Sequence, residues 1–520
     1  MTASRTSARL PKVRAQSAAG APDVSGAGLA RNTALNLLGL GLPLVVALIA
    51  VPILLAGLGT DRFGLLGLGW MFIALSGEIG FGRAGTRFVA EALGGGRGQA
   101  IGRILRMTTG AQLVLGVLAG GALAALASWL TRSVFGVPAE LSSEAHTAFL
   151  LVAATIPAAM LAGVLRGALE AAQRFDLVNL VRFVVSAASY LLPLVALWAG
   201  WGLVGVMALL FLGRVGAAVA YGTLVARVFA HALHRESPEG PGLRELLGFG
   251  GWVTASSLAT PVLVYLDRFL LGALVSVAAV GVYTAPYELV TRLVLIPGSL
   301  AATLFPAFST LRGMGRGGEL AALMGRASRY VLGSVGPAAT LLAVGAVPIL
   351  SLWLGTGYAP EGAVALRILG LGVLASAVAM IPFSLLQAAG RADVSGKIHL
   401  AELAPYVLVA WVLVARWGVA GAAWAWTLRA LADAGLLYLA ASREAPGWFR
   451  GERRRMAGTV ACLALAGAGG YAVVRSLGSA VLAVGALCAG AVILMPLFWR
   501  VSLAREERAR IVGFLNGVRA

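Results

Sequence analysis

Long apolar stretches, separated by short polar segments, recur along almost the whole chain. Each stretch is about 20 residues long, which is the length of α-helix that crosses the hydrocarbon core of a bilayer. Since no water reaches that depth, every backbone N–H and C=O has to pair within its own segment, and this favours helices. A transmembrane β-barrel would show shorter segments of alternating polarity, which this sequence lacks. The pattern therefore predicts an all-α, polytopic membrane protein.

Hydropathy divides the chain into about fourteen transmembrane helices. The first six are expected at 33–56, 65–90, 105–130, 146–165, 177–199 and 201–229. Six more are expected at 248–271, 278–305, 330–354, 364–388, 399–415 and 419–439. A final pair is expected at 457–474 and 480–498. Residues 1–30, rich in Ala, Ser, Gly and Arg, are predicted to be a disordered cytoplasmic N-terminus and not a signal peptide.

Composition supports this interpretation. Of the 520 residues, 59% are hydrophobic and 12% are charged, about half the charged share of a soluble domain. The net charge of +19 does not indicate a nucleic-acid partner, because the basic residues lie in short loops and not on one basic face. Cys462 and Cys488 suggest neither a disulfide framework nor a metal site. The four histidines are scattered, and no cofactor is expected.

The distribution of arginine between the predicted loops gives the orientation, because cytoplasmic loops carry an excess of Lys and Arg. With a cytoplasmic N-terminus, the inward loops hold dense groups of Arg, such as that in 443–455. The outward loops hold only Arg62, Arg132, Arg416 and Arg475. Both termini are therefore expected to be cytoplasmic.

An internal repeat divides the predicted helices into two sets. Segments 169–176 and 386–393 share the pattern L-[EQ]-A-A-x-R-x-D at an offset of 217 residues, and segments 201–205 and 417–421 match at an offset of 216. Because six helices return the chain to its starting side, the two copies should have the same orientation. They should be related by a pseudo-two-fold axis along the membrane normal, and can rock to give alternating access to a midplane site.

The repeat sets the expected boundaries of the chain. They are an N-lobe at 31–230, a cytoplasmic linker at 231–247, a C-lobe at 248–441, a C-terminal helix pair at 442–499 and a basic cytoplasmic tail at 500–520. The repeated octad itself has two interpretations. In the simpler one it is a membrane-proximal turn, with Arg at the lipid headgroups and Asp176 or Asp393 capping the next helix. The other is a direct substrate role.

Eight arginines fall inside predicted spans and more than two residues from a span's end, where a charge is costly. An Arg at the centre of a transmembrane helix costs about 2.5–3.5 kcal/mol on insertion scales. Most of them must therefore face a wet cavity, pair with acids, or extend to an interface. The eight are Arg83, Arg87, Arg182, Arg214, Arg268, Arg292, Arg367 and Arg429.

Helical spacing supplies acidic partners for some of these arginines, because residues i and i+4 share a helix face. Glu288 is so placed with Arg292, and Asp433 with Arg429. Glu78 and Glu91 are the acids expected near Arg83 and Arg87. Asp267 and Arg268 should point apart, and each should find a partner elsewhere. Those without an acid within one helical turn are Arg182, Arg214 and Arg367.

The balance of charge within the predicted spans is positive, which favours an anionic ligand. Guanidinium groups bind phosphate oxygens bidentately, so a wet cleft lined by Arg suits a phosphate or pyrophosphate group. The candidate substrate-binding residues are Arg83, Arg87, Arg214, Arg268 and Arg292. The alternative for each of them is a structural role, as an ion-pair partner or an interfacial anchor.

Three carboxylates in the spans are candidates for ion coupling. Buried carboxylates can titrate near neutral pH, so Glu78, Asp267 and Glu288 could couple transport to protons or sodium. The alternative is that they serve only as salt-bridge partners of the arginines.

Several motifs together resemble one known family. They are YLDRFLLG at 265–272, VGVY at 280–283, LFPAFS at 304–309, DRFGLL at 61–66 and EIGFGR at 78–83. On these residues the chain resembles the bacterial polysaccharide and oligosaccharide flippases of the multidrug/oligosaccharidyl-lipid/polysaccharide exporter superfamily. The likeness extends over about residues 31–440.

The resemblance implies a flippase without enzymatic activity in the bacterial inner membrane. Such proteins move undecaprenyl-pyrophosphate-linked saccharides to the outer leaflet, and hold the headgroup in a central, often cationic cavity between their lobes. The implied partners are this lipid-linked oligosaccharide, inner-membrane lipids, and a glycan polymerase or glycosyltransferase. The extra pair within 457–498 departs from the twelve spans of many such flippases and is shared with lipid II flippases, where it is thought to form a lipid groove.

Other functions stay open. A cation-coupled multidrug efflux antiporter of the same superfamily should have a cavity dominated by acids and aromatics, whereas Arg outnumbers acid inside these spans. A lipid II flippase is a further alternative. A membrane-embedded polymerase or glycosyltransferase would need a sizeable extramembrane catalytic loop or a clustered acid–base site. The longest interior loop here is about 20 residues and holds neither.

Overall fold

The computed structural model describes residues 26–78, 82–95, 97–233 and 259–509. Within these ranges the chain consists of helices joined by turns, without a β-strand, so the predicted all-α membrane class is confirmed. Ten of the described helices are long and apolar enough to cross a membrane, or eleven if a pair bent by 75° is one span. The expected count of about fourteen stays a prediction.

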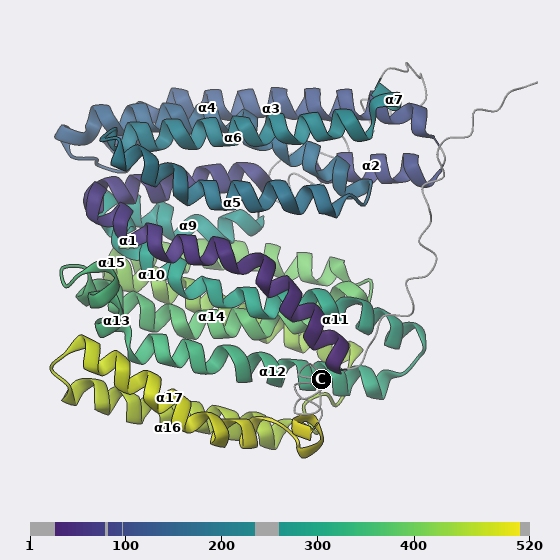
Figure 1. Ribbon diagram of the computed structural model, residues 1–520, viewed down its shortest axis with the longest axis vertical. Helices are drawn as coiled ribbons and strands as arrows, with labels where there is room; N and C mark the ends of the chain where they lie inside the picture. The colour runs from purple at the N-terminus through teal and green to yellow at the C-terminus, as the bar shows by residue number, and fades with distance from the viewer. Residues whose placement is uncertain (1–25, 79–81, 96, 234–258, 510–520) are drawn as a thin grey trace, which may run out of the picture.

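In their order along the chain, the described helices are divided here into two large groups and a final pair (Figure 1). The first group comprises α1 (Gly26–Glu78), α2 (Gly82–Gly94), α3 (Ile101–Trp129), α4 (Ser142–Ala171), α5 (Phe175–Trp198), α6 (Gly202–Val228) and α7 (Ala230–Leu233). The second comprises α9 (Ala259–Leu274), α10 (Val277–Thr291), α11 (Leu295–Gly313), α12 (Gly317–Val344), α13 (Ala346–Leu354), α14 (Ala359–Ala388) and α15 (Ala392–Glu444). The final pair is α16 (Arg453–Ser476) and α17 (Ala480–Ser502).

Some predicted spans differ from the described helices. The expected helix at 65–90 covers the end of α1 and most of α2, and residues 79–81 between them lie outside the described part of the chain. The expected helix at 278–305 is divided by a 3-10 turn at Arg292–Val294. Of the seventh expected span, residues 248–258 are not described.

The long helix α15 is a hairpin of two antiparallel helices. The backbone of Gly418 has φ 52° and ψ −125°, which breaks the helix. Beyond it the chain turns back so closely that a Cβ at Gly421 would lie 1.9 Å from the carbonyl oxygen of Leu413. Across the hairpin, Nε2 of His399 lies 3.3 Å from a carboxylate oxygen of Asp433. The expected spans 399–415 and 419–439 are the two arms of this hairpin.

Both copies of the repeated octad form the same helix–turn–helix joint. The fifth residue has positive φ in each, 56° at Gln173 and 73° at Gly390. The backbone N–H of the following Arg donates to the carbonyl of the octad's first Leu, at 2.9 Å and 2.8 Å. This is the bond of a Schellman helix end. The expected capping role of the Asp is wrong for both copies, since Arg174 and Arg391 are the N-caps of α5 and α15, and Asp176 and Asp393 lie in the first turns.

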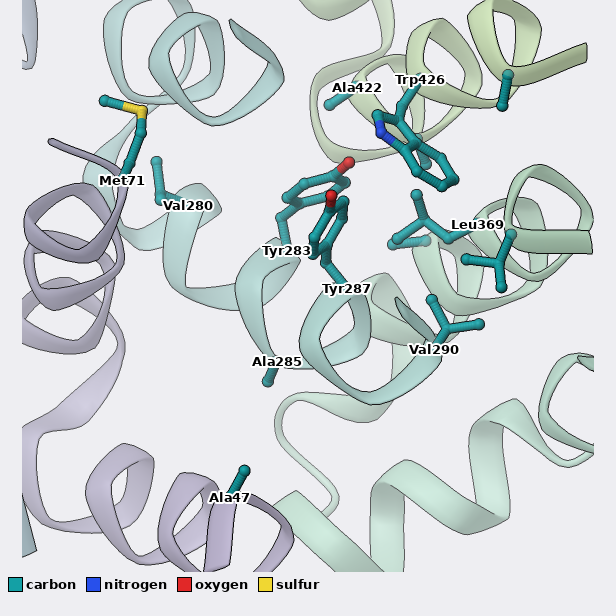
Figure 2. Packing of buried hydrophobic residues seen from close by; sticks show 14 of the residues in the cluster. Ala47, Met71, Val280, Tyr283, Ala285, Tyr287, Val290, Leu369, Ala422 and Trp426 are labelled. Atoms are coloured by element: carbon teal, nitrogen blue, oxygen red, sulfur yellow. The ribbon is translucent and has the colours of Figure 1, made fainter. Parts of the chain in front are cut away.

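Helix α1 packs deeply against the second group of helices. A Cβ at Gly64 would lie only 1.8 Å from the carbonyl oxygen of Val277, at the start of α10. Nearer the N-terminus, the indole N–H of Trp353 in α13 donates to the carbonyl of Leu48 at 2.7 Å. The two groups therefore share one apolar core, which is shown in part in Figure 2.

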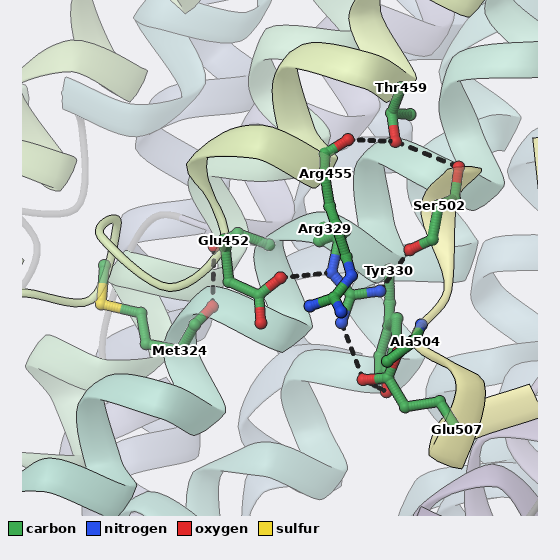
Figure 3. A network of polar contacts seen from close by, with 10 residues as sticks. Met324, Arg329, Tyr330, Glu452, Arg455, Thr459, Ser502, Ala504 and Glu507 are labelled. Carbon is green, nitrogen blue, oxygen red and sulfur yellow. Dashed lines mark hydrogen bonds and ion pairs between the residues drawn. The ribbon is translucent and has the colours of Figure 1, made fainter. Parts of the chain in front are cut away.

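The final pair is fastened to α12 by a buried arginine (Figure 3). The side chain of Arg329 is 1% exposed; its Nε lies 2.5 Å from Glu452 before α16, and its NH2 lies 2.7 Å from Glu507 after α17. A third hydrogen bond goes to the backbone carbonyl of Ser502. Tyr330 also donates to Glu507, at 2.6 Å. We call these five residues the clasp.

Candidate functional site

A cluster of charged and aromatic side chains lies where α5 meets α10. The guanidinium group of Arg292, in the turn after α10, donates to the Tyr190 hydroxyl and to the Glu288 carboxylate. Tyr190 donates to Glu288 at 3.3 Å. The i,i+4 spacing aligns Glu288 with Arg292, and their expected ion pair is confirmed. Tyr190 comes from α5, 98 residues away from Glu288, so the cluster joins the two groups of helices.

Arg268 extends this cluster into the protein interior. Its side chain is 4% exposed, and its NH2 lies 3.9 Å from Glu288. The guanidinium carbon lies 3.9 Å from the centre of the Tyr287 ring and 5.4 Å from that of Tyr265. Cation–π contacts of this kind stabilise a desolvated guanidinium group. Arg268 is therefore held between one carboxylate and two aromatic rings.

Asp267, next to Arg268, points to a different partner. Its carboxylate is fully buried and accepts hydrogen bonds from the Tyr283 hydroxyl and from the backbone N–H of Arg268. The expectation that these neighbours diverge and find partners elsewhere is confirmed.

Arg214 approaches the cluster from α6. Its NH2 donates to the hydroxyl of Ser189 at 3.4 Å, and Ser189 is next to Tyr190 in α5. Among the described residues Arg214 has no ion pair with a carboxylate. It therefore adds a positive charge without a carboxylate partner on the neighbouring helix α6, next to the segment of α5 that carries Tyr190.

A second polar cluster lies inside the α15 hairpin. The expected pairing of Arg429 with Asp433 is wrong: Arg429 lies 4.0 Å from Glu402, and Asp433 lies 3.3 Å from His399. Tertiary packing decided this, because the antiparallel arm brings two further ionisable side chains to the face that Arg429 and Asp433 share. The rings of Tyr287 and Trp426, 5.6 Å apart, connect this cluster to the first (Figure 2).

The other predicted residues lie elsewhere. Arg87 is half exposed in α2 and pairs with Glu91 at 2.7 Å, as its spacing predicted. Helix α2 packs on α3 and α4, so Arg87 is not brought to the cluster around Arg292. The side chains of Glu78 and Arg83 lie outside the described residues.

Charge and exposure define what the first cluster can do. The guanidinium groups of Arg214, Arg268 and Arg292 outnumber the carboxylates of Asp267 and Glu288 by one. The side chains of Arg292 and Glu288 are 28% and 22% exposed, whereas Arg268 is enclosed. The outer edge of the cluster, at Arg292 and Glu288, can therefore exchange partners with an anion, whereas its inner part, at Arg268, is fixed.

Sequence reasoning missed the aromatic and hairpin members of these clusters. Tyr190, Tyr283 and Tyr287 belong to apolar spans in which a tyrosine has no distinctive spacing. Glu402 could have been found, because it is an acid within the expected span 399–415. His399 has no such signal, because the four histidines are scattered along the sequence.

Comparison with solved structures places this arrangement of helices in a known class. An inward-facing multidrug resistance MATE family transporter of the MOP superfamily matches with a TM-score of 0.66 at 16% identity, covering 80% of this chain and 99% of that one. A MOP superfamily transporter from Pyrococcus furiosus, whose structure title reports a binding pocket of reversed polarity, matches with a TM-score of 0.58 at 16% identity, covering 81% and 96%. The chain thus has the multi-pass helical fold of MOP superfamily transporters.

Within that class the family is also defined by sequence. The sequence model of the family described as "Polysaccharide biosynthesis protein" matches residues 29–312, more than half of the chain, and the chain belongs to this family. A relative from Shigella flexneri described as "Putative O-antigen transporter" is 28% identical over 416 residues, which is 78% of this chain and 96% of the relative. The family resemblance drawn from the motifs is therefore confirmed.

Proposed function

We propose that this protein is a flippase that moves an undecaprenyl-pyrophosphate-linked oligosaccharide or polysaccharide unit across the bacterial inner membrane. Family membership, the O-antigen transporter relative and the transporter fold support this. The proposal includes the expected orientation, with both termini cytoplasmic, and the lobes at 31–230 and 248–441. It also includes inner-membrane lipids and glycan-assembling enzymes as partners.

The observation that carries the proposal is that Arg268 and Arg292 both lie against the single carboxylate of Glu288, while Arg214 in α6 has no carboxylate partner among the described residues. A pyrophosphate carries several anionic oxygens, and Arg binds such oxygens in bidentate fashion. In our mechanism the headgroup displaces Glu288 from Arg292 and also engages Arg214, the arginine without a carboxylate partner. When Glu288 pairs with Arg292 again, the headgroup is released.

This exchange suits alternating access. The cluster takes Tyr190 and Arg214 from the first group of helices, and Glu288 and Arg292 from the second. A headgroup bound there touches both groups and can stabilise one relative orientation over another, as differential affinity requires. Asp267 and Glu288 remain our candidates for ion coupling, and Glu78 remains a candidate from the sequence.

The proposal is tested by deletion and complementation. Loss of the gene should trap lipid-linked glycan in the inner leaflet, and the wild-type gene should restore surface glycan. Complementation by Arg214→Gln or Arg292→Gln should fall about 10- to 100-fold, since a hydrogen bond to a charged group contributes about 1.5–3 kcal/mol. Arg316→Gln is the matched control, because Arg316 forms an exposed pair with Glu319 far from the cluster in sequence.

The outcomes separate the parts of the proposal. Normal glycan export in the deletion strain would refute the flippase itself. Normal export by both Arg214→Gln and Arg292→Gln would leave the flippase but remove our headgroup site. The double variant Arg83→Gln/Arg87→Gln tests the second group of candidate arginines in the same strain.

The second candidate function is a cation-coupled multidrug efflux antiporter. The multidrug transporters among the fold matches favour it, as does the hydrogen bond from the aromatic Tyr190 to Glu288. It predicts that deletion sensitises cells to cationic drugs while surface glycan stays normal. A lipid II flippase would instead be identified by arrested peptidoglycan synthesis.

A further inference from the structure

Several buried polar groups in the α15 hairpin lack a hydrogen-bond partner among the described residues. These are both carboxylate oxygens of Glu402, Oδ1 of Asp433, the hydroxyl of Tyr406, the indole N–H of Trp426 and Nε of Arg429. The Glu402 side chain is 6% exposed, and Tyr406 and Trp426 are 3% and 4% exposed. Leaving such groups unpaired in an apolar interior costs about 1–3 kcal/mol each. Their concentration at one place indicates that the hairpin binds a species that is not part of the chain.

The unpaired groups face one another across the hairpin. His399, Glu402 and Tyr406 follow at i, i+3 and i+7 and so share a face of the first arm. Arg429 and Asp433 share a face of the second arm at i and i+4. The guanidinium carbon of Arg429 lies 5.8 Å from the centre of the Tyr406 ring, and 6.0 Å from that of Trp426.

The charges inside the hairpin do not balance. Glu402 and Asp433 interact electrostatically with each other, and Arg429 is the one arginine paired with either of them among the described residues. A second unit of positive charge would balance the pair. A metal ion is disfavoured, because the guanidinium group 4.0 Å from Glu402 repels cations and the described residues contain no group of three metal-binding side chains. The same guanidinium group opposes a proton as well, but a proton needs no set of ligands, and His399 lies beside Asp433.

The surroundings of the hairpin connect it to the headgroup cluster. From α14, the Phe383 ring stacks on His399, with centres 6.0 Å apart. From α9 and α10, the charges of Asp267 and Arg268 and the hydroxyl of Tyr287 act on Tyr406. Asp267 also interacts electrostatically with Arg429. A change of charge in the hairpin therefore changes the electrostatic potential at Arg268 and Glu288.

We propose that Glu402 and Asp433 share one exchangeable proton, that His399 passes this proton to and from water, and that its binding strengthens anion binding at the Arg268–Arg292 cluster. In this step a neutral His399 takes a proton from water, which forms one N–H bond, and then gives it to a carboxylate, so that this N–H bond breaks, one O–H bond forms and the imidazole is neutral again. Once Glu402 is neutral, Arg429 has lost its counter-charge and the neighbouring cluster becomes more positive. The coupling to the headgroup rests on the proposed function, but the proton site does not.

Infrared spectroscopy of the full-length protein in lipid tests the site without any substrate. Raising the pH from about 5 to about 9, the range in which buried carboxyls and histidine titrate, should remove a carboxylic-acid C=O band in the wild type. Glu402→Gln should lack this band. Glu319→Gln, which changes an exposed acid in α12, should keep it.

A second variant covers the case in which Glu402→Gln does not fold. Asp433→Asn removes a like charge beside Glu402, so the midpoint of the band's pH dependence should move down by about one pH unit or more. Retention of the band in folded Glu402→Gln, an unchanged midpoint in Asp433→Asn, or a midpoint that moves when sodium replaces choline would each overturn the proton site. If the band behaves as expected but inorganic pyrophosphate binds equally at both pH limits, the coupling fails and the site stands.

Discussion

At the scale of single residues, the polar groups of the first cluster are arranged by long-range contacts. Asp267 and Arg268 are neighbours in sequence, yet each is stabilised by a side chain of α10. A carboxylate without such a partner would be strongly destabilising in a protein interior. The tyrosines that complete the cluster therefore act as essential partners of the charges.

The hydrogen bond between Tyr283 and Asp267 should show a measurable coupling. Tyr283→Phe leaves a fully buried carboxylate with one hydrogen bond fewer, which should lower the free energy of unfolding by about 1.5–3 kcal/mol. Combined with Asp267→Asn, the effects should be clearly less than additive. Thermal unfolding in detergent measures all three variants. Tyr471→Phe, at a half-exposed position of α16, is the control, and additive effects would show that the two side chains do not interact.

The sequence predicted residue contacts only where helical spacing determines them. The pairs of Glu288 with Arg292 and of Arg87 with Glu91 follow from one helix turn. The partners of Arg429 and Tyr190 depend on which helices pack together, and spacing along one helix contains no such information. Arg429 shows how this misleads, since an acid at i+4 was available and a residue from the other arm of the hairpin is its partner.

At the scale of helices, close backbone contact holds the first group to the second. Gly64 in α1 meets the backbone of α10 with no room for a methyl group. Hydropathy located these helices well, because apolar length alone determines a span. It also placed loops at 57–64 and 416–418, where Gly59 and Gly418 break the helices. It could not locate the 75° bend between α12 and α13, since such a bend depends on backbone angles that glycine permits but does not enforce.

Adding a methyl group at this contact should separate the two helices. Gly64→Ala should destabilise the protein by about 1–3 kcal/mol, the usual cost of overpacking, because the added methyl group would meet backbone atoms of Val277. Gly77→Ala, in the same helix with nothing within 4 Å of its Cβ position, should be neutral or slightly stabilising. Melting temperatures in detergent compare the two, and equal effects would argue against the contact.

The clasp makes the attachment of α16 and α17 depend on pH. Burial would raise the pKa of the Glu507 carboxyl, but hydrogen bonds from Arg329 and Tyr330 outweigh it and lower the pKa to about 2. The stabilisation is therefore complete above the ordinary carboxyl pKa of about 4.3 and is lost as the pH falls towards 2.

Replacement of Glu507 should remove this dependence. Glu507→Gln should unfold at a lower temperature than the wild type at neutral pH, and the difference should shrink as the pH falls from about 4.3 to about 2. Glu506→Gln, at the exposed neighbouring position, should match the wild type throughout. A constant difference between Glu507→Gln and the wild type across this range would mean that the carboxylate charge does not stabilise the clasp.

At the scale of the whole molecule, two groups of helices meet along an apolar interface that carries a charged cluster at its centre. Because α1 is buried against α10 and α13, the association of the groups does not require a covalent link between them. Apolar packing and polar pairs such as Tyr190 with Glu288 should suffice within the bilayer.

Separate expression of the two parts tests this. If the chain is cut within the expected linker 231–247, the two fragments should co-purify when expressed together and restore glycan export, and neither should do so alone. The same cut in the Gly64→Ala background should weaken co-purification, while Gly77→Ala should not affect it. Failure of two correctly inserted fragments to associate would show that the linker is required.

The matching turns at Gln173 and Gly390 have a consequence for the history of the molecule. Both turns have positive φ at the fifth residue and the same backbone hydrogen bond, as expected if a gene for a chain of half the length was once doubled and the ancestor worked as a symmetric pair. The ionic cluster is not symmetric: Asp267, Arg268, Glu288 and Arg292 all belong to the later copy, while the earlier one supplies Tyr190 and Arg214. Fusion freed each copy to mutate alone, and a polarised binding surface is something a strict homodimer could not have evolved.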